Sequence, residues 1–323
     1  MNYGISYKGS KSRIAKWVVE ALPSAEVWVE PFAGGCAVTH AAILSGKYKK
    51  FVINDMTDSA KFFVDAVNGK FKNENRWISR EDFFRLKKDD TYVRLCFSFG
   101  NNQRTYCYNE QVEPYKKAFH YAICFGDFSL FEDMGISIPE DVFKRCSSAK
   151  DRRCAIKDIL VKLNYPDNLQ RLQSMERLER LWSLQSLKGM GDIEVFQGDY
   201  RELEIPKEEK YVIYCDPPYI NTEGYFTNFN HEEFYDWVKQ QKNCYISEYW
   251  MPEDFERVDY IYIKLYHFVE RTKAITSKKV FGFVKIIYFS WYGKIFNRRR
   301  KRERITYLDE RQFPEAERET VYP

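Results

Sequence analysis

The sequence predicts an α/β fold in which a Rossmann-like sheet carries helices on both faces. The prediction depends on short apolar runs that each end in an acidic residue, at Val27–Glu30, Phe51–Asp55 and Tyr211–Asp216. Short apolar runs bounded by chain breakers are typical of buried strands. Segments with helical spacing of apolar residues lie between these runs, and such alternation favours a parallel sheet.

Length and composition narrow the class of protein. With 323 residues, of which 44% are apolar, the chain is long enough for one large α/β domain and a smaller inserted or appended one. Its net charge of +4 is weak evidence for a nucleic-acid partner by itself. The eight cysteines are scattered without a C-x-x-C pair, so neither a disulfide framework nor a metal site is expected. Because the sequence shows no secretory signal and no long apolar run, we expect a cytoplasmic protein without membrane contact.

The segment Asp216-Pro217-Pro218-Tyr219 follows the predicted strand Tyr211–Cys215. Prolines cannot continue a sheet ladder, so the chain leaves the strand end in a stiff, extended turn. The turn places the Asp216 carboxylate, the Pro217 carbonyl and the Tyr219 ring at the edge where open α/β sheets bind ligands. Since carboxylate and carbonyl oxygens only accept hydrogen bonds, they suit an –NH2 group. The adjacent ring can stack on a nucleobase, although an ordinary turn remains the alternative.

A second group of residues suits a nucleoside ligand without phosphates. The segment Glu30-Pro31-Phe32-Ala33-Gly34-Gly35 follows the first predicted strand, and paired glycines let a ligand approach the backbone closely. Because the G-x-G-x-x-G spacing is absent, a dinucleotide is not favoured. Asp55 ends the second predicted strand about 20 residues after the glycine turn, where an acidic residue holds a ribose diol. We therefore expect an adenosine-type ligand, and S-adenosylmethionine fits that description.

The order of these motifs resembles that of the Dam-type (D12 class) DNA adenine-N6 methyltransferases. In that family a motif like Tyr7-Lys8-Gly9-Ser10-Lys11 precedes the glycine motif, and a target-recognition insert separates the glycine motif from the Asp-Pro-Pro-Tyr tetrad. The resemblance extends from residue 5 to residue 290. One departure is Cys36, where family members often carry a further glycine. Because cysteine is small, we expect tighter packing of the methionine moiety and no loss of binding.

The resemblance implies a role for each motif residue. Asp216 and Pro217 would accept the two hydrogens of a flipped-out adenine amine, and Tyr219 would stack on the base. The methyl group would pass directly from S-adenosylmethionine to N6. The residues expected to hold this cofactor are Tyr7, Lys11, Glu30, Phe32, Gly34, Asp55, Asp199 and Asp216. For Asp199, a structural role in a turn is the close alternative.

Residues 75–165 are expected to form an inserted, mainly helical target-recognition domain, with Ser79 capping its first helix. Within it, Leu95–Tyr106 places amides and an arginine around a glycine turn, and these side chains read base edges bidentately. The base-reading candidates are Asn101, Asn102, Gln103 and Arg104. The phosphate-binding candidates are Lys116, Lys117, Arg145, Lys150, Arg152 and Arg153. For any single one of these residues, a polar surface loop is the alternative.

The rest of the chain is expected to complete a catalytic domain formed by residues 1–74 and 166–290, with residues 291–323 as a basic and polar tail. A helix predicted over Leu169–Leu187 buries an apolar stripe and leaves Arg171, Arg177 and Arg180 on its solvated face. The loop Asn221–Asn230 would close over the extruded base. The segment Asn230-His231-Glu232-Glu233 is expected to start a helix with a cap, to which His231 belongs, and residues 257–268 and 278–290 are expected to form an antiparallel strand pair.

These observations together predict a site-specific enzyme that methylates adenine N6 in double-stranded DNA. It would use S-adenosylmethionine and need no metal, and a monomer is favoured although the sequence does not determine the oligomeric state. The alternatives left open are methylation of cytosine N4 or of an RNA adenine, and a catalytically idle DNA-binding protein on the same fold. A protein-glutamine methyltransferase would usually carry Asn in place of Asp216. The recognised DNA sequence does not follow from the insert, although GATC is common in the family that the chain resembles.

Overall fold

The structure of the protein is a computed structural model, which describes residues 2–139, 141–162, 164, 172–206, 210–219, 229–248, 255–266 and 280–290. The predicted lid residues 221–228, the loop 270–279 and the basic tail 291–323 lie outside the described residues. The chain divides into two compact units, Met1–Asp216 and Pro217–Pro323.

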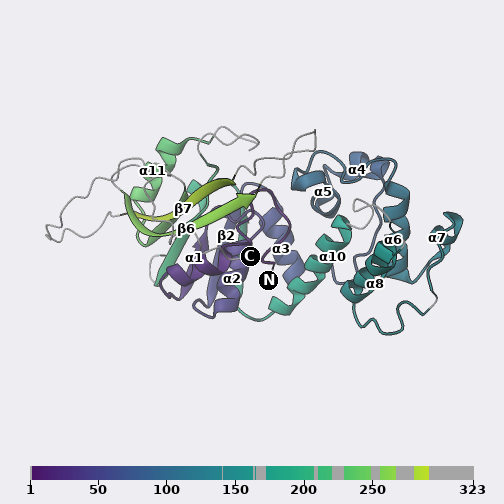
Figure 1. The fold of residues 1–323 in the computed structure, drawn as a ribbon. Helices are drawn as coiled ribbons and strands as arrows, with labels where there is room; N and C mark the ends of the chain where they lie inside the picture. The colour runs from purple at the N-terminus through teal and green to yellow at the C-terminus, as the bar shows by residue number, and fades with distance from the viewer. Residues whose placement is uncertain are drawn as a thin grey trace, which may run out of the picture. The chain divides into compact units, whose positions relative to one another are not determined.

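The first unit is built on a parallel sheet whose strands lie in the order β3-β2-β1-β4. Figure 1 labels one of these strands, β2. The strands are β1 (Val27–Glu30), β2 (Lys50–Asp55), β3 (Asp192–Gln197) and β4 (Tyr211–Cys215). Each neighbouring pair is parallel, so the carboxyl ends of the strands share one edge. Because the acidic residues follow the strand ends, the fold gathers them at this edge, as the sequence predicted.

Three helices flank this sheet, α1 (Ala15–Ala21), α2 (Ala37–Ser45) and α3 (Ser59–Val67). Helix α2 packs against β1 and α1, whereas α3 packs against β2 and β3. The core beneath them is aromatic: Trp28 is fully buried and stacks on Tyr214 with 5.7 Å between ring centroids. Such a ring removes roughly 150–250 Å² of surface from water, so it anchors β1 against β4.

The stretch predicted to be a helical insert is helical. Its elements are α4 (Arg80–Leu86), α5 (Thr91–Cys96), the 3-10 turn η1 (Phe99–Asn101), α6 (Glu113–Phe125), α7 (Ser129–Asp133) and α8 (Ala149–Lys162). The Ser79 hydroxyl caps α4 by accepting a hydrogen bond from the Asp82 amide, as predicted. The contacts group these helices with the parallel sheet in the first unit, so the domain boundaries at residues 74 and 165 stay predictions.

Helix α10 (Gln173–Ser183) and the 3-10 turn η2 (Leu184–Leu187) lead back to the sheet. The sequence predicted that its arginines lie on a solvated face, and this was wrong for Arg177. The Arg177 side chain is buried and donates hydrogen bonds to the carbonyls of Cys96 (2.9 Å) and Ser98 (2.7 Å). Carbonyls left over at the end of α5 need donors, and this guanidinium supplies them.

The second unit contains α11 (His231–Lys239), β5 (Cys244–Glu248), β6 (Phe255–Tyr266) and β7 (Val280–Ser290). The predicted antiparallel pair is confirmed, because β7 pairs antiparallel with both β6 and β5. The Asn230 side chain caps α11 by accepting hydrogen bonds from the Glu232 and Glu233 amides. Its role as a cap was read correctly from the sequence.

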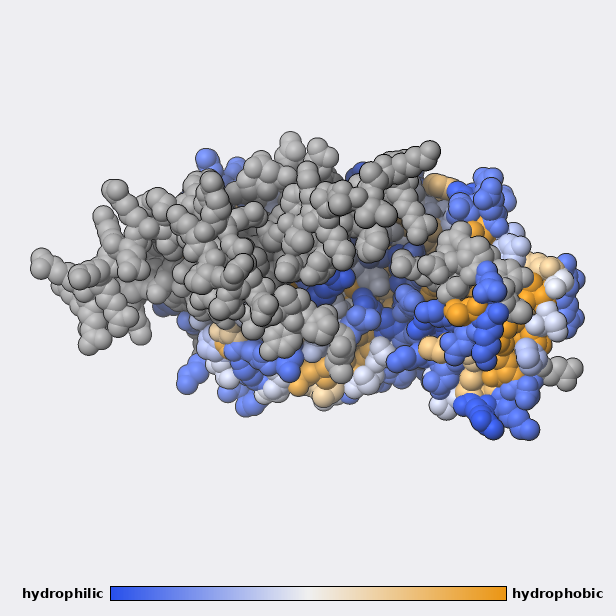
Figure 2. Space-filling model, viewed as in Figure 1, coloured by the Kyte–Doolittle hydropathy of each residue, from blue (hydrophilic) through white to orange (hydrophobic). Residues whose placement is uncertain are grey.

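The surface of the described residues is mostly hydrophilic in the view of Figure 2. Hydrophobic patches, drawn in orange, lie over the part of that view where Figure 1 draws α6, α7 and α8. Exposed apolar side chains on these helices include Phe125, 52% exposed, and Val161, 48% exposed. No helix among the described residues combines the length and the apolar character that crossing a bilayer requires.

Candidate active site

The glycine turn after β1 is filled by the N-terminal segment of the same chain. A Cβ atom built on Gly35 would lie 2.6 Å from Cβ of Tyr7, and one on Gly4 would lie 2.2 Å from the Gly35 carbonyl oxygen. The Ile5 amide donates to the Gly35 carbonyl at 2.8 Å. These glycines therefore permit the approach of the Gly4–Tyr7 segment, in addition to any approach by a ligand.

Cys36 occupies a backbone position that favours glycine. Its φ angle of 54° lies in the left-handed region, which costs a residue with a Cβ atom about 1–2 kcal/mol. The residue ends the glycine turn immediately before α2, and its side chain is fully buried. The positive φ gives a physical reason why a glycine suits this position.

Glu30, at the carboxyl end of β1, is buried and holds two neutral donors. The Trp28 indole N–H donates to its carboxyl oxygen Oε2 at 3.1 Å, and the Thr39 hydroxyl donates to the same oxygen. Burial raises the pKa of Glu30 to about 8, with a smaller contribution from the nearby Asp216 charge. Burial thus favours the protonated form of Glu30, and a cation or another donor beside it would favour the ionised form.

Asp55, at the carboxyl end of β2, organises the turn that follows. Its oxygen Oδ2 accepts from the Gly34 amide at 2.7 Å, while Oδ1 accepts from the Thr57 amide (2.9 Å) and hydroxyl (2.7 Å). The Thr57 hydroxyl lies 3.4 Å from the Tyr7 hydroxyl. Burial first, and then the Asp55 charge, raise the pKa of Tyr7. The cofactor candidates Tyr7, Gly34 and Asp55 are therefore brought together.

Lys11 lies at the catalytic candidate Asp216. Its ammonium Nζ is 2.5 Å from Asp216 Oδ2 and donates to the Gly9 carbonyl at 3.0 Å. Both side chains are well buried, with 8% of Lys11 and 15% of Asp216 exposed. The sequence placed Lys11 among the cofactor residues, whereas this contact gives it a partner in the tetrad. The signal was available in principle, because the sequence analysis expected both residues to hold the cofactor.

The other two cofactor candidates take different positions at the edge. The Phe32 ring packs against Tyr200, with 4.9 Å between centroids. Asp199 caps the 3-10 turn η3 (Tyr200–Glu202) and binds the Arg201 guanidinium at 2.6 and 2.9 Å, which lowers the pKa of Asp199. This arrangement favours the alternative considered for Asp199, a structural turn acid.

Within the second unit, His231 contacts the main chain of the tetrad. Its ring nitrogen Nε2 lies 2.9 Å from the Pro218 carbonyl oxygen. A carbonyl only accepts hydrogen bonds, so Nε2 carries the proton and donates it. Tyr219 is buried. Sequence reasoning assigned His231 only to the helix cap and missed this contact, since thirteen positions separate the two residues.

The predicted recognition loop is a compact turn between Ser98 and Tyr106, which form an isolated antiparallel bridge. The loop contains Gly100, Asn101 and Gln103, all with positive φ near 55–60°. The Asn102 side chain accepts from the Arg104 amide (2.8 Å) and donates to the Thr105 hydroxyl (2.7 Å), so it stabilises the turn. Arg104 is exposed. Of the base-reading candidates, Arg104 is the most exposed, whereas the Asn102 side chain forms hydrogen bonds within the loop itself.

The two predicted phosphate contacts of helix α6 differ in exposure. Lys116 is only 1% exposed, and its ammonium lies 5.9 Å from the Tyr108 ring centroid and 5.8 Å from that of Phe119. Burial lowers the pKa of Lys116 to about 8. This position contradicts the expectation of a phosphate contact, because the helical spacing turns Lys116 inward with the apolar stripe of α6. Lys117, half-buried beside the Tyr121 ring, keeps access to solvent.

The chemistry of the edge suits a cationic nucleoside better than an anionic one. Carboxyl groups end β1 and β2, and Asp216 follows β4. A carboxylate disfavours a phosphate beside it, and a sulfonium or ammonium group near Glu30 would favour the ionised form of this buried acid. Among the described residues, no cluster of three or more histidine, cysteine or acidic side chains has a geometry suited to a metal ion.

Comparison with known proteins agrees with this chemistry. A search among curated proteins found no match. The family model of the D12 class N6 adenine-specific DNA methyltransferases matches residues 7–250, which include the glycine turn, Asp55 and the whole tetrad. That match spans most of the chain and is specific for the amine of adenine in DNA, rather than for cytosine N4. The chain therefore belongs to the D12 class of N6 adenine-specific DNA methyltransferases.

Proposed function

We propose that this DNA adenine methyltransferase takes its methyl group from S-adenosylmethionine and transfers it directly to N6 of an adenine turned out of double-stranded DNA. The observation that carries the proposal is the position of Asp216. It follows β4 at the edge where Glu30 and Asp55 end their strands, and it is buried beside Lys11. A carboxylate in this place meets both the cofactor end of the sheet and the reacting amine.

The residues of the edge divide into two groups by their chemistry. Asp55 suits the hydroxyls of a ribose, and the Phe32 ring beside Tyr200 suits the face of an adenine. Glu30 faces the positive end of the ligand, since a cation there compensates the charge that burial disfavours. When bound, S-adenosylmethionine supplies a methyl group activated by its sulfonium charge.

Asp216 and Pro217 act on the amine. The N6 lone pair is delocalised into the ring, so the amine is a poor nucleophile until its geometry changes. Two acceptors that hold its hydrogens favour the pyramidal form and stabilise the positive charge that develops on nitrogen. Tyr219 would hold the base by stacking once it has left the duplex, because N6 is out of reach inside the stack.

Lys11 pairs with the Asp216 carboxylate and fixes its orientation. A carboxylate positioned before the substrate arrives does not need to reorganise during the reaction, and this is how preorganised electrostatics lowers a barrier. The buried ion pair thus links the N-terminal motif to the tetrad. Its role here is in catalysis, beside the cofactor site rather than within it.

The proposal is tested by separating cofactor binding from methyl transfer. The Asp216→Asn variant keeps the size of the side chain and should still bind S-adenosylmethionine by calorimetry, while transfer of labelled methyl groups to duplex DNA falls at least 100-fold, a far larger loss than any loss of cofactor affinity. Asp55→Asn should instead weaken cofactor binding. Wild-type protein that binds DNA but transfers no methyl group would contradict the proposed function.

A further inference from the structure

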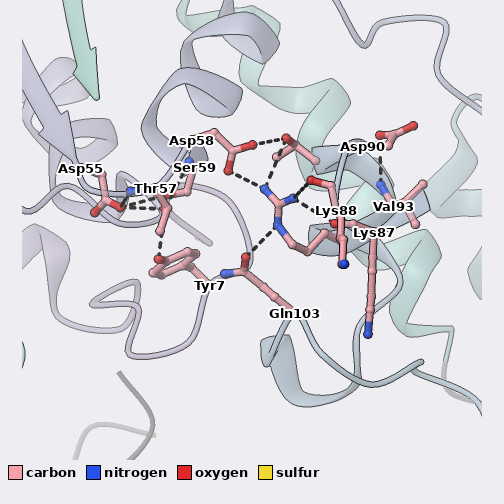
Figure 3. A network of polar contacts seen from close by, with 12 residues as sticks. Tyr7, Asp55, Thr57, Asp58, Ser59, Lys87, Lys88, Asp90, Val93 and Gln103 are labelled. Carbon is pink, nitrogen blue, oxygen red and sulfur yellow. Dashed lines mark hydrogen bonds and ion pairs between the residues drawn. The ribbon is translucent and has the colours of Figure 1, made fainter. Parts of the chain in front are cut away.

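Arg94, on helix α5, has four different groups of partners around one guanidinium (Figure 3). Its Nε donates to Gln103 Oε1 at 3.0 Å, and its Nη2 is 2.5 Å from Asp58 Oδ1. The Lys87 carbonyl accepts from Nη1 at 3.0 Å, and Nη2 also approaches the Thr91 hydroxyl. The side chain is 17% exposed. The planar guanidinium has several N–H donors in fixed directions and can bind all of these acceptors at once. A lysine ammonium at this position could not do so.

One side of the Arg94 guanidinium fixes the turn that follows β2 at the proposed cofactor site. Asp58 is the residue immediately before α3 and stands three residues after Asp55. Burial pushes the pKa of Asp58 upward, but the hydrogen bonds from Arg94 and Thr91 outweigh it and leave the pKa lowered. Thr57, between the two acids, contacts both Asp55 and Tyr7. Arg94 therefore holds the turn that carries Asp55, the residue proposed to bind the ribose of the cofactor.

The other side of the guanidinium fixes the recognition loop. Gln103 has a φ of 60°, a conformation that the loop must stabilise through contacts elsewhere. Because its carbonyl oxygen is bound by Arg94, its amide nitrogen faces Tyr7, as Figure 3 shows. A hydrogen bond from Gln103 contributes to the environment of the Tyr7 hydroxyl. The loop and the cofactor motif thus share a polar network centred on Arg94.

We infer that Arg94 is a positioning residue that couples DNA recognition to cofactor binding, by holding Gln103 of the recognition loop and the Asp55–Asp58 turn in one network. The inference rests on the proposed function, since it takes the loop as the DNA reader and Asp55 as the cofactor ligand. When Gln103 contacts a DNA duplex, its contacts with Arg94 and Tyr7 change. The contacts through which Arg94 holds the Asp55–Asp58 turn then change as well. Binding of DNA and of cofactor then favour each other, and the effect is reciprocal.

The test measures this coupling at equilibrium, with S-adenosylhomocysteine as the probe so that no turnover occurs. The DNA is a short duplex that carries a site methylated by the wild type, identified by sequencing of modified bases. The coupling factor is the ratio of the dissociation constants of S-adenosylhomocysteine without and with this duplex. We expect a ratio of at least about 5 for the wild type. Arg94→Gln should bring the ratio to within about twofold of 1.

Two further variants and a control separate coupling from general damage. Arg94→Lys keeps the charge beside Asp58 but loses the planar guanidinium, so it should lose the coupling as well, even where Arg94→Gln fails to fold. Gln103→Ala should lose it, and the Arg94→Gln/Gln103→Ala double variant should show no additional loss. The matched control is Arg76→Gln, which removes an arginine that pairs with Glu74 and with Asp90, the cap of α5. It should leave the ratio unchanged.

A wild-type ratio of 1, or a ratio in Arg94→Lys equal to that of the wild type, overturns the inference. Loss of coupling in Arg76→Gln to the same extent also overturns it, because the effect would then belong to helix α5 as a whole. These results differ from failure of the proposed function. In that case the wild type methylates no adenine or binds no S-adenosylhomocysteine at all, whereas here methylation by the wild type continues.

Discussion

The Lys11 ammonium lies 2.5 Å from the Asp216 carboxylate, so the N-terminal motif and the tetrad form a buried ion pair. Removal of one partner leaves a buried charge alone, which costs about 3 kcal/mol or more of folding stability. The pair therefore has a structural effect and a catalytic effect that experiments can separate.

Lys11→Met should reduce both stability and activity. We expect a loss of about 3 kcal/mol in the free energy of unfolding, measured in urea, because the Asp216 charge loses its partner. The kcat/KM for methyl transfer should fall about 100-fold, since the carboxylate is no longer preorganised. The double variant Lys11→Met/Asp216→Asn should regain most of the stability and none of the activity. Equal stability of Lys11→Met and of the double variant would show that loss of the ion pair does not cause the destabilisation.

The raised pKa of Glu30 predicts that the free energy of unfolding depends on pH. In the folded protein its pKa is raised to about 8, whereas the unfolded chain releases this proton near its ordinary value. Between these values the folded state holds a proton that the unfolded state lacks, so stability falls as the pH rises, by up to about 1.4 kcal/mol per pH unit. Glu30→Gln should flatten urea unfolding measured from pH 5 to 8 and be the more stable protein at pH 8. Glu26→Gln, at an exposed pair with Lys49, is the control and should not change the slope.

Cys36 allows a test of the left-handed backbone. With φ of 54°, Cys36→Gly should be more stable than Cys36→Ala by about 1 kcal/mol, because glycine alone avoids the Cβ penalty. The same pair of substitutions at Cys154, inside helix α8, should show the opposite order by a similar amount, about 1 kcal/mol. Thermal unfolding of the four proteins checks both signs. If glycine is the less stable residue at both positions, the backbone conformation of Cys36 is not the one described.

Much of the fold followed from the sequence. Apolar runs ending in acids predicted β1, β2 and β4 because parallel strands are buried and bind ligands at their carboxyl ends. The capping side chains Ser79 and Asn230 marked the starts of α4 and α11 for a local reason: short polar side chains satisfy free amides.

Residues whose role depends on distant partners were harder to predict. Arg177 looked like part of a solvated face, yet it binds carbonyls about 80 positions away, at Cys96 and Ser98. Lys116 followed the polar pattern expected of a phosphate contact but turned inward with α6. Periodicity reports which face of a helix is apolar and not what packs against the opposite face, so buried cations escape it.

Arg104 and Lys116 make contrasting predictions for DNA binding. Arg104 is exposed on the recognition loop, so Arg104→Gln should weaken binding to the DNA site that the wild type recognises by about 1–3 kcal/mol. If it reads a base, specificity at one position relaxes; if it binds a phosphate, the slope of affinity against salt falls by about 1. Lys116→Met should leave affinity and salt slope as in the wild type, because the ammonium is buried. Fluorescence anisotropy over a range of salt concentrations measures both quantities, and a large loss in Lys116→Met would contradict the buried position.

The most direct test of the central claim identifies the atom that Asp216 helps to methylate. Purified protein is incubated with unmethylated duplex DNA and S-adenosylmethionine labelled in its methyl group, and the DNA is then digested to nucleosides and separated by chromatography. The account predicts that all label in the DNA is found in N6-methyl-2′-deoxyadenosine for the wild type, and that none is found for Asp216→Ala. Label in N4-methyl-2′-deoxycytidine, or undiminished label in Asp216→Ala, would contradict it.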